Sequence, residues 1–587
     1  MNAKKWFEAM PDILHAELET LRHGLAYFEF LHQEPLDESN NNISIIGNIE
    51  YEEDKKQLVR ILFPQSYPYT PPEIFPLEEQ NLIINGIIAR SPVPKPFYRG
   101  NQYTNNKICL FEDEKQWEPF RTWVGFAMNQ ARLWFLAVYS KEGFTSNLIV
   151  PESIAYLPHI GQILYYWPKE FNNSSSGRLI CKSFKENYYS LLQVQEDNSS
   201  VVYNTFPDDT PLSPLKNNYI IGKWFAVKDQ DVRTFLVNIS NSQYFISHLE
   251  TVHKIRLGDI LPNPSCESQK FIIGFRIKAE EKLHCFQITY WKEGTTTKFD
   301  HRYLLPKNLN NELFARIDSL FNLEKLSKKK VLIVGLGAIG SGVASDLASC
   351  GVNNFYLVDD EDFDAGNSVR HASDLLMIGE KKVSISRKLI LGKNPSAKVT
   401  ILPVSIFQLP LELLEEIINN VDLVLDLTAN ALVEEYLNQK VCNEKGKTLI
   451  QAAVSKGALT GIILILEPSK SACLNCLKKQ KLSQVPISAL STEKLENTAP
   501  DYGACSKPAL PGSGIDTKSV SIQTARIALQ LLSTNEESFY QNLQGHQYYW
   551  HGPAGTTSED GVIHAPFEWE IKEVGGCENC EFCEYKL

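Results

Sequence analysis

The chain has 587 residues, 43% of them hydrophobic, and a formal net charge of -12. That length accommodates roughly three or four globular domains with cores of their own, and the acidic balance weighs against nucleic acid as the main partner. No leader-like start and no apolar run of about 20 residues occur, so the sequence predicts a cytoplasmic protein without a membrane span.

Residues 1–165 are predicted to form an α+β domain. The segment 6–24 has apolar residues near helical spacing, and the runs 42–51 and 55–64 have the composition of strands. A segment that can form neither a helix nor a central strand follows, because it contains Pro64, Pro68, Pro71 and Pro72. Taken alone, this segment is interpreted most simply as a rigid surface loop.

Cys109 lies in the string NQYTNNKICLFEDEKQWEP, eight residues after Asn101 and eight before Trp117. Together with the preceding FPQSYPYTPP, this frame resembles the catalytic core of ubiquitin-conjugating enzymes. The resemblance implies that Cys109 carries a thioester and that Asn101 stabilises the oxyanion formed when a lysine attacks it. Arg99 and Gly100 stand where that family usually has His and Pro, so the support of the Asn loop differs. An inert buried thiol is the alternative interpretation of Cys109.

Residues 166–315 are predicted to form a β-rich connecting domain. Polar stretches rich in Pro, Ser and Asn, at 171–179 and 196–218, predict loops or a linker. Apolar runs predict strands that begin near Trp224, Arg233, Lys270 and Leu283. No motif in this region carries chemistry, and its role does not follow from the sequence.

Residues 316–587 are predicted to form an α/β, Rossmann-like domain. The strand VLIVG leads through Gly335, Gly337 and Gly340 into a helix, an arrangement in which backbone N–H groups approach a phosphate closely. Asp359 ends the next predicted strand, about 20 residues further on, where a carboxylate meets a ribose hydroxyl. These features alone suit an NAD-dependent dehydrogenase equally well.

The string DDEDFDAGNSVRH, followed by GEKK, resembles ubiquitin-activating enzymes and the related adenylyltransferases of thiamin and molybdopterin biosynthesis. The resemblance implies ATP binding, with Asn367, Arg370 and Lys382 at the phosphates. Attack of a carboxylate on the α-phosphate brings two anions together, so fixed cations are needed. Without the resemblance, a basic pair on a loop is interpreted as a solvated surface.

One position departs from that family. A TDN-like string normally supplies an Asp ligand for Mg²⁺, whereas this chain reads LVLDLTAN and has Ala429 there. Asp426, three residues earlier, is the candidate ligand, because a strand-end carboxylate near phosphates suits Mg²⁺. A capping or ion-pairing role for Asp426 is the alternative, and catalytic competence therefore stays open at this point.

Cysteines in a reducing compartment serve better as nucleophiles or metal ligands than as structural disulfides. The pair Cys473 and Cys476 forms a CxxC motif, and the tail supplies Cys577, Cys580 and Cys583. Two thiolates from each region complete the tetrahedral sulfur site that structural Zn²⁺ prefers, with the choice of tail ligands open. Related activating domains carry a similar split pair of CxxC motifs, and a redox pair is the rival interpretation.

Cys505 lies in a Pro/Gly-rich segment before a predicted helix that contains Gln523. Relatives of the activating family have a cysteine in a crossover loop at this place, where it takes the acyl group from the adenylate. The resemblance implies this role for Cys505. An incidental loop cysteine is the alternative.

The two resemblances span about 1–165 and 316–587. Their order is similar to the bacterial fusion of conjugating and ThiF-family activating domains found in anti-phage CBASS operons. This likeness implies a homodimer that adenylates a protein C-terminus, passes it from Cys505 to Cys109 and ligates it to a lysine-bearing acceptor. The activated protein is then a cGAS-like nucleotidyltransferase, primed by conjugation, or a ubiquitin-like protein. A sulfur-carrier adenylyltransferase and a non-catalytic docking scaffold are the alternatives.

Overall fold

The computed structural model divides the chain into two compact units. The N-terminal unit comprises Met1–Tyr203 and Asn218–Lys307, and the C-terminal unit comprises Asn204–Asn217 and Asn308–Leu587. No helix among the described residues is long and apolar enough to cross a membrane. The structure describes residues 5–35, 42–84, 87–95, 106–108, 110, 117–139, 161–166, 175–197, 202–204, 219–227, 247, 249–251, 254–263, 265, 267–277, 282–488, 512–533, 544–558, 561–577 and 580.

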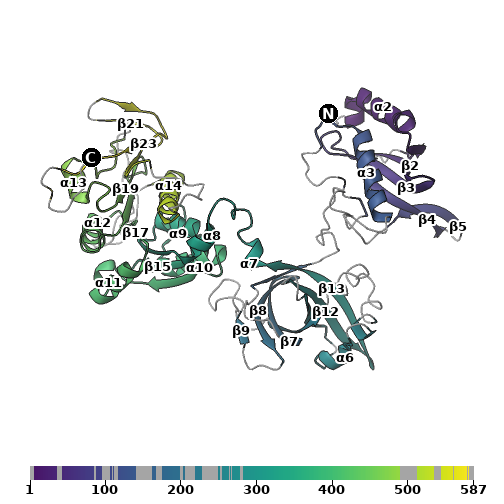
Figure 1. The fold of residues 1–587 in the computed structure, drawn as a ribbon, viewed down its shortest axis with the longest axis horizontal. Coiled ribbons are helices and arrows are strands. Elements are labelled where there is room, and N and C mark those ends of the chain that lie inside the picture. Colours follow the sequence, from purple (N-terminus) through teal and green to yellow (C-terminus); the bar gives the residue numbers. More distant parts are fainter. Residues whose placement is uncertain are drawn as a thin grey trace. The chain divides into compact units, whose positions relative to one another are not determined.

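The first part of the N-terminal unit is an antiparallel sheet with one long helix, α3 (Val124–Tyr139) (Figure 1). Its strands are neighbours in chain order: β1 (Phe28–Gln33), β2 (Ile43–Glu52), β3 (Lys55–Phe63), β4 (Glu73–Ile84) and β5 (Ile87–Pro94). β2 and β3 confirm the two predicted strands. Apolar side chains of both strands, such as Ile45 and Ile61, share one core with Ala131 and Trp134 of α3.

The single helix predicted for 6–24 is broken in the structure. It consists of α1 (Trp6–Ala9), α2 (Pro11–Glu19) and a π-helical turn at Thr20–Gly24. Pro11 has no backbone N–H, so it cannot continue α1, although proline is well tolerated as the first residue of the next helix.

The second part of the N-terminal unit is a sheet closed on itself, in which β6 pairs with β8 as well as with β13. The described strands other than β9 therefore form a ring, which Figure 1 shows nearly end-on. A short helix, α6 (Leu257–Ile260), belongs to the same region. The order of strands is β6 (Gly161–Tyr165), β13 (Thr296–Asn308), β12 (Lys282–Glu293), β11 (Gln269–Ile277), β10 (Tyr219–Val227), β7 (Ser176–Lys185), β8 (Tyr188–Glu196) and β9 (Val202–Asn204).

Strands β10, β11 and β12 coincide with three predicted strands, and the run near Arg233 lies outside the described residues. The loop predicted for 171–179 is wrong at its end, because β7 begins at Ser176. Gly177 explains the difference: it pairs with Glu196 of β8, and a Cβ there would lie only 1.9 Å from the carbonyl oxygen of Gln195. The domain boundaries at 165 and 315 stay predictions.

The C-terminal unit is built on an eight-stranded mixed sheet. The order is β16 (Lys398–Leu402), β15 (Asn354–Val358), β14 (Lys330–Val334), β17 (Leu423–Asp426), β18 (Leu449–Val454), β19 (Gly461–Leu466), β20 (Gln547–Trp550) and β23 (Trp569–Lys572). The strands from β16 to β18 are parallel and the last three antiparallel. A small separate hairpin consists of β21 (Thr556–Thr557) and β22 (Ile563–His564).

Helices cover both faces of this sheet (Figure 1). Along β14, Val331 and Ile333 pack with side chains of α9, α10 and α14, whereas Leu332 and Val334 pack with α11, α12 and α13. A parallel strand buried on both faces requires an uninterrupted apolar run, which is what VLIV supplies. The helices are α7 (Leu309–Glu312), α8 (Leu323–Lys328), α9 (Gly340–Ser349), α10 (Lys382–Lys393), α11 (Leu411–Asn420), α12 (Ala431–Leu437), α13 (Leu474–Lys479) and α14 (Gly514–Leu532).

The chain is thus a multidomain α/β protein, and its parallel sheet reverses direction at one place. From β14 the chain builds outward through β15 and β16, and then returns to the other side of β14 with β17 and β18. The carboxyl ends of β14 and β17 therefore meet at the reversal point, where open α/β sheets bind their ligands.

Candidate active site

The predicted glycine-rich turn lies at this reversal point. Gly335 follows β14 with a φ of +86°, and a Cβ there would lie 2.8 Å from the backbone nitrogen of Thr428. Gly340 opens α9, and its Cβ would lie 1.9 Å from the carbonyl oxygen of Gly335. Among the described residues, no atom lies within 4 Å of a Cβ built on Gly337. The turn is therefore tightly packed at two glycines and open at the third, where the N-terminus of α9 is suited to an anionic group.

Asp359, one residue past β15, fastens this turn. Its Oδ2 accepts the N–H of Leu336 at 2.6 Å, and its Oδ1 accepts the N–H of Glu361 at 2.9 Å. Burial raises the pKa of this carboxyl. The structure thus brings Asp359 to the glycine turn, and its contact with a ribose stays a prediction.

Lys382 is the first residue of α10, and its side chain is only 7% exposed. Its Nζ lies 2.5 Å from Oε2 of Glu361, whose side chain is half exposed. A buried ammonium needs a partner, and a phosphate would compete with Glu361 for that place. Sequence reasoning missed Glu361, although it stands two residues after Asp359 in the same acidic string.

The loop that carries Arg370 is fixed by its own hydrogen bonds. Oδ1 of Asn367 accepts the N–H of Asp364 at 2.9 Å, and the N–H of Arg370 donates to the carbonyl of Asn367 at 2.9 Å. The loop thus holds Asn367 and Arg370 three residues apart. That the Asn367 amide and the Arg370 guanidinium bind the phosphates stays a prediction.

His371, which sequence reasoning missed, joins this loop to the glycine turn. It is 5% exposed, and its Nε2 lies 3.0 Å from the carbonyl oxygen of Leu336. Nδ1 accepts the N–H of Ser373 at 3.1 Å, so Nε2 carries the proton that it donates to Leu336. Burial lowers the pKa of His371 to about 4. The only signal in the sequence was its position directly after Arg370.

We expect His371 to make the protein less stable as the pH falls. Its pKa is about 4 in the folded chain, against an ordinary value of 6.5, so the unfolded chain takes up the proton first. The contribution of neutral His371 to the free energy of unfolding is complete above pH 6.5 and is lost as the pH falls toward 4. About 2 kcal/mol of it is lost at pH 5. Urea unfolding of the wild-type and His371→Gln chains at pH 7.5 and pH 5 should show their stability difference shrinking by that amount. A constant difference would contradict the buried neutral imidazole.

Asp426 ends β17 and is buried, with 1% of its surface exposed. Its Oδ1 accepts from the hydroxyl of Thr428 at 2.7 Å, and its Oδ2 accepts from Gln451 at 3.3 Å. Burial raises its pKa to about 6. Ala429 is exposed beside it with a φ of +51°, a conformation that Asp and Asn adopt more readily than Ala. Asp426 therefore lies at the reversal point, and its role as a Mg²⁺ ligand stays a prediction.

Cys505 lies outside the described residues, but the ends of its segment are anchored in the C-terminal unit. Ser488 forms an antiparallel bridge with Thr556, and Gly512 forms a parallel bridge with Gly457. A Cβ on Gly512 would lie 3.5 Å from Nη1 of Arg370. Gly512, the first described residue after 488, therefore lies beside the loop that carries Arg370.

Three cysteine side chains gather at the start of α13, and Cys577 adjoins them. The Sγ atoms of Cys473, Cys476 and Cys580 lie within 4.8 Å of one another, and those of Cys473 and Cys580 are 3.5 Å apart. The N–H of Cys577 donates to Sγ of Cys476 at 3.1 Å, and Sγ of Cys577 lies 3.7 Å from the carbonyl oxygen of Cys476. The predicted CxxC pair thus meets the tail at Cys577 and Cys580, while Cys583 lies outside the described residues.

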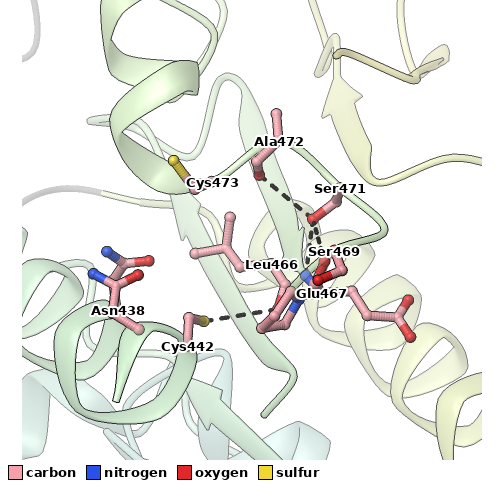
Figure 2. Close-up of a pocket in the computed structure, with 10 residues that line it drawn as sticks. Asn438, Cys442, Leu466, Glu467, Ser469, Ser471, Ala472 and Cys473 are labelled. Carbon is pink, nitrogen blue, oxygen red and sulfur yellow. Dashed lines mark hydrogen bonds between the residues drawn. The ribbon is translucent and has the colours of Figure 1, made fainter. Parts of the chain in front are cut away.

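A small pocket adjoins this thiol cluster (Figure 2). Figure 2 shows Cys442 facing the carbonyl of Leu466, and Sγ of Cys442 lies 3.8 Å from that carbonyl oxygen. Burial raises the pKa of the Cys442 thiol to about 12, so this thiol is unsuited to act as a nucleophile. The pocket lies beside Cys473 and away from the glycine turn, and is lined by Asn438, Cys442, Asn443, Leu466, Glu467, Pro468, Ser469, Ser471, Ala472 and Cys473.

In the N-terminal unit, Cys109 and Asn101 lie outside the described residues. The parts of their frame that are described share one core: Ile108 and Leu110 are buried, and Nε1 of Trp117 donates to the carbonyl of Pro68 at 2.8 Å. The buried carboxylate of Glu17 accepts the Tyr67 hydroxyl and, at 3.0 Å, the N–H of Val124. Pro68 of the proline-rich segment and Trp117 are thus in contact.

Comparisons with known proteins match the C-terminal unit. The ThiF family model matches residues 309–550. The uncharacterized protein y4qC of Sinorhizobium fredii (strain NBRC 101917 / NGR234) is 29% identical over 230 residues, which are 37% of this chain and 39% of that protein. Ubiquitin-like modifier-activating enzyme 5 of Caenorhabditis elegans is 27% identical over 164 residues, which are 26% of this chain and 38% of that enzyme. The match to the crystal structure of Escherichia coli MccB with AMPCPP and MccA covers 44% of this chain and 68% of the MccB chain, with 17% identity and a TM-score of 0.32.

The C-terminal unit therefore contains a domain that matches the ThiF family. The matched region spans about two fifths of the length of the curated relatives named above. The predicted ubiquitin-conjugating-like domain and the two-domain fusion stay predictions.

Proposed function

We propose that the C-terminal unit uses ATP to adenylate the C-terminal carboxylate of a protein, and that the acyl group then passes through two cysteines to an amine. The observation that supports this most is the convergence, at the reversal point of the sheet, of the open glycine turn, Lys382 and the loop of Arg370 that His371 fastens. A relative named ubiquitin-like modifier-activating enzyme 5 favours a ubiquitin-like protein, or another protein with an exposed C-terminus, as the substrate.

The chain's own residues would do the following. The N-terminus of α9 and the cations Lys382 and Arg370 bind the ATP phosphates, so that the substrate carboxylate can form a bond to the α-phosphate while the bond to pyrophosphate breaks. Asn367 adds its amide group at the phosphates. Mg²⁺ would neutralise phosphate charge, with Asp426 as its candidate carboxylate, provided that Asp426 exchanges the Thr428 hydroxyl for the ion.

The later steps assign roles to cysteines by their place in the chain. The thiolate of Cys505 attacks the acyl carbon of the adenylate, and AMP leaves. Cys505 precedes Gly512 by seven residues in the sequence, and Gly512 adjoins Arg370. Cys109 then takes the acyl group by thiol exchange, and an amine displaces Cys109 with Asn101 at the oxyanion. If the chain acts as the CBASS fusions that it resembles, a homodimer would prime a cGAS-like nucleotidyltransferase in this way.

The three gathered thiols, with Cys577 beside them, fit Zn²⁺, because thiolate sulfur is its preferred structural ligand and the N–H of Cys577 supports one of the sulfurs. Cys473, Cys476, Cys577 and Cys580 would hold the ion and tie the tail to α13. Cys583 would be left over.

Lys382→Ala is expected to weaken ATP binding by about 10- to 100-fold, because it removes a charge-assisted contact to a phosphate. Lys388→Ala is the matched control: Lys388 lies on the same helix, but its ammonium is exposed and held by Glu380 at 2.7 Å. Titration calorimetry with ATP and Mg²⁺ measures both, and pyrophosphate exchange with a candidate C-terminal peptide then tests adenylation.

Ala429 favours a second candidate, the non-catalytic docking scaffold, since the usual Mg²⁺ ligand of the family is missing there. If the wild-type chain binds no ATP in the same titration, the scaffold is the better reading. If it binds ATP and exchanges pyrophosphate while Cys109 is dispensable for every product, the sulfur-carrier adenylyltransferase is favoured.

A further inference from the structure

Two histidines and a glutamate meet near the end of the described chain, and none of them belongs to the glycine turn or to the thiol cluster. His551 follows β20, His564 ends β22 and Glu570 lies in β23. Their ligand atoms all lie within 4.8 Å of one another. Three segments of the chain that are separate in sequence thus contribute one potential ligand each.

His551 has a buried nitrogen without a hydrogen-bond partner among the described residues. The residue is 2% exposed, and its Nδ1 is hydrogen-bonded to the hydroxyl of Thr556 at 2.6 Å. Its Nε2 makes no hydrogen bond to any part of the chain that the structure describes, and it lies 3.6 Å from Oε2 of Glu570, too far for one. An unsatisfied buried nitrogen is costly, and a bond from the other ring nitrogen to an oxygen is the usual support of a metal-binding histidine.

Glu570 is arranged to offer one oxygen to the same place. Its Oε1 is held by Nζ of Lys572 at 3.0 Å, while its Oε2 lies 3.6 Å from His551 and 3.9 Å from Nε2 of His564. Glu568 approaches the other ring nitrogen of His564, Nδ1, at 3.9 Å. Two carboxylates and one ammonium therefore surround the imidazoles, which favours a cation between them.

We propose that His551, His564 and Glu570 bind a divalent transition-metal ion, of the class of Zn²⁺. Imidazole nitrogen and carboxylate oxygen are ordinary ligands of this ion, and three protein ligands leave a fourth position for water. Ligands about 2.0–2.1 Å from a tetrahedral ion lie roughly 3.4 Å apart. The two separations from Oε2 of Glu570 to the histidine nitrogens, 3.6 and 3.9 Å, are therefore close to what such an ion requires.

Binding also requires one ring to turn. The imidazoles of His551 and His564 are stacked in parallel with centroids 3.9 Å apart, and an ion cannot lie in both ring planes at once. His551 is held by Thr556, so His564, which is 11% exposed, is the ring that moves. The ion then joins the end of β20 to the β21–β22 hairpin and to β23. Because Thr556 of this hairpin also bridges Ser488, the same ion secures the last described residue before the Cys505 segment.

The test counts zinc in the full chain, stripped by chelator and then reloaded. His564→Gln and Glu570→Gln should each bind about one equivalent less than the wild-type chain, whatever the thiol cluster holds. His15→Gln, an exposed histidine elsewhere, should bind as much as wild type. With Co²⁺ in place of Zn²⁺, the absorption lost in these variants should lack the thiolate charge-transfer band. Equal zinc content in all four chains would overturn the proposal. Glu570 would then interact with a protonated imidazole instead of a metal ion.

Discussion

A Cys505→Ala chain is expected to form the acyl adenylate and yet to leave both proposed thioester sites empty. A Cys109→Ala chain should still carry a thiol-labile adduct on Cys505. The reason is that a thioester on Cys109 arises only by thiol exchange from an upstream thioester, so the two changes are not equivalent. Non-reducing electrophoresis after incubation with ATP and a candidate carboxyl protein separates these outcomes.

Two further variants complete this experiment. Cys350→Ala is the control, because burial raises the pKa of that thiol and it should load nothing. Asn101→Ala should load Cys109 normally but fail to form the amide, a loss on the order of a few kcal/mol in the aminolysis barrier. Loading of Cys109 in the Cys505→Ala chain would reverse the proposed order of transfer, and normal ligation by Asn101→Ala would remove the oxyanion role.

The second large effect is expected from Cys473→Ser, which should release zinc and unfold much of the C-terminal unit. Structural zinc contributes roughly 10–16 kcal/mol of apparent binding free energy, comparable with or larger than the net stability of about 5–15 kcal/mol of a domain. Cys473 meets Cys580, which is 107 residues further along the chain, so the loss of one ligand also frees the tail.

Cys442→Ala is the matched control for this change, because Cys442 lines the pocket next to Cys473 but its thiol faces the carbonyl of Leu466. This variant should keep its zinc and most of its stability. Elemental analysis and thermal unfolding of the three chains give the answer. An unchelated wild-type chain without zinc in the thiol cluster would refute the site, and a Cys473–Cys476 disulfide found by mass spectrometry would favour the redox pair instead.

The glycine turn was predictable because its determinants are local. The apolar run of β14, the spacing of Gly335, Gly337 and Gly340 and the following Asp359 all lie within 30 consecutive residues, and the structure assembles them at one sheet edge. The break at Met10 was equally local but was missed, because helical spacing continues across it while Pro11 removes the N–H.

What the sequence could not give is contact between distant segments. His371 reaches Leu336 across 35 residues, and nothing in its neighbourhood indicates that its ring is buried there. In the same way, the five cysteines predicted a cluster but not its members, since only the path of the tail brings Cys577 and Cys580 to α13. The pairing of Glu361 with Lys382 likewise depends on how β15 and α10 come together.

The first residue of α14 lies directly against the loop of Arg370: a Cβ on Gly514 would be 2.3 Å from the carbonyl oxygen of Val369. Two parts of a protein in such contact cannot change position independently, and equilibria at the two places are then linked. If nucleotide in the glycine turn alters the equilibrium constant for acylation of Cys505, acylation of Cys505 must alter the equilibrium affinity for nucleotide by the same factor. Measured in both directions, this single factor would show how strongly the loading of the thiol is tied to the release of AMP.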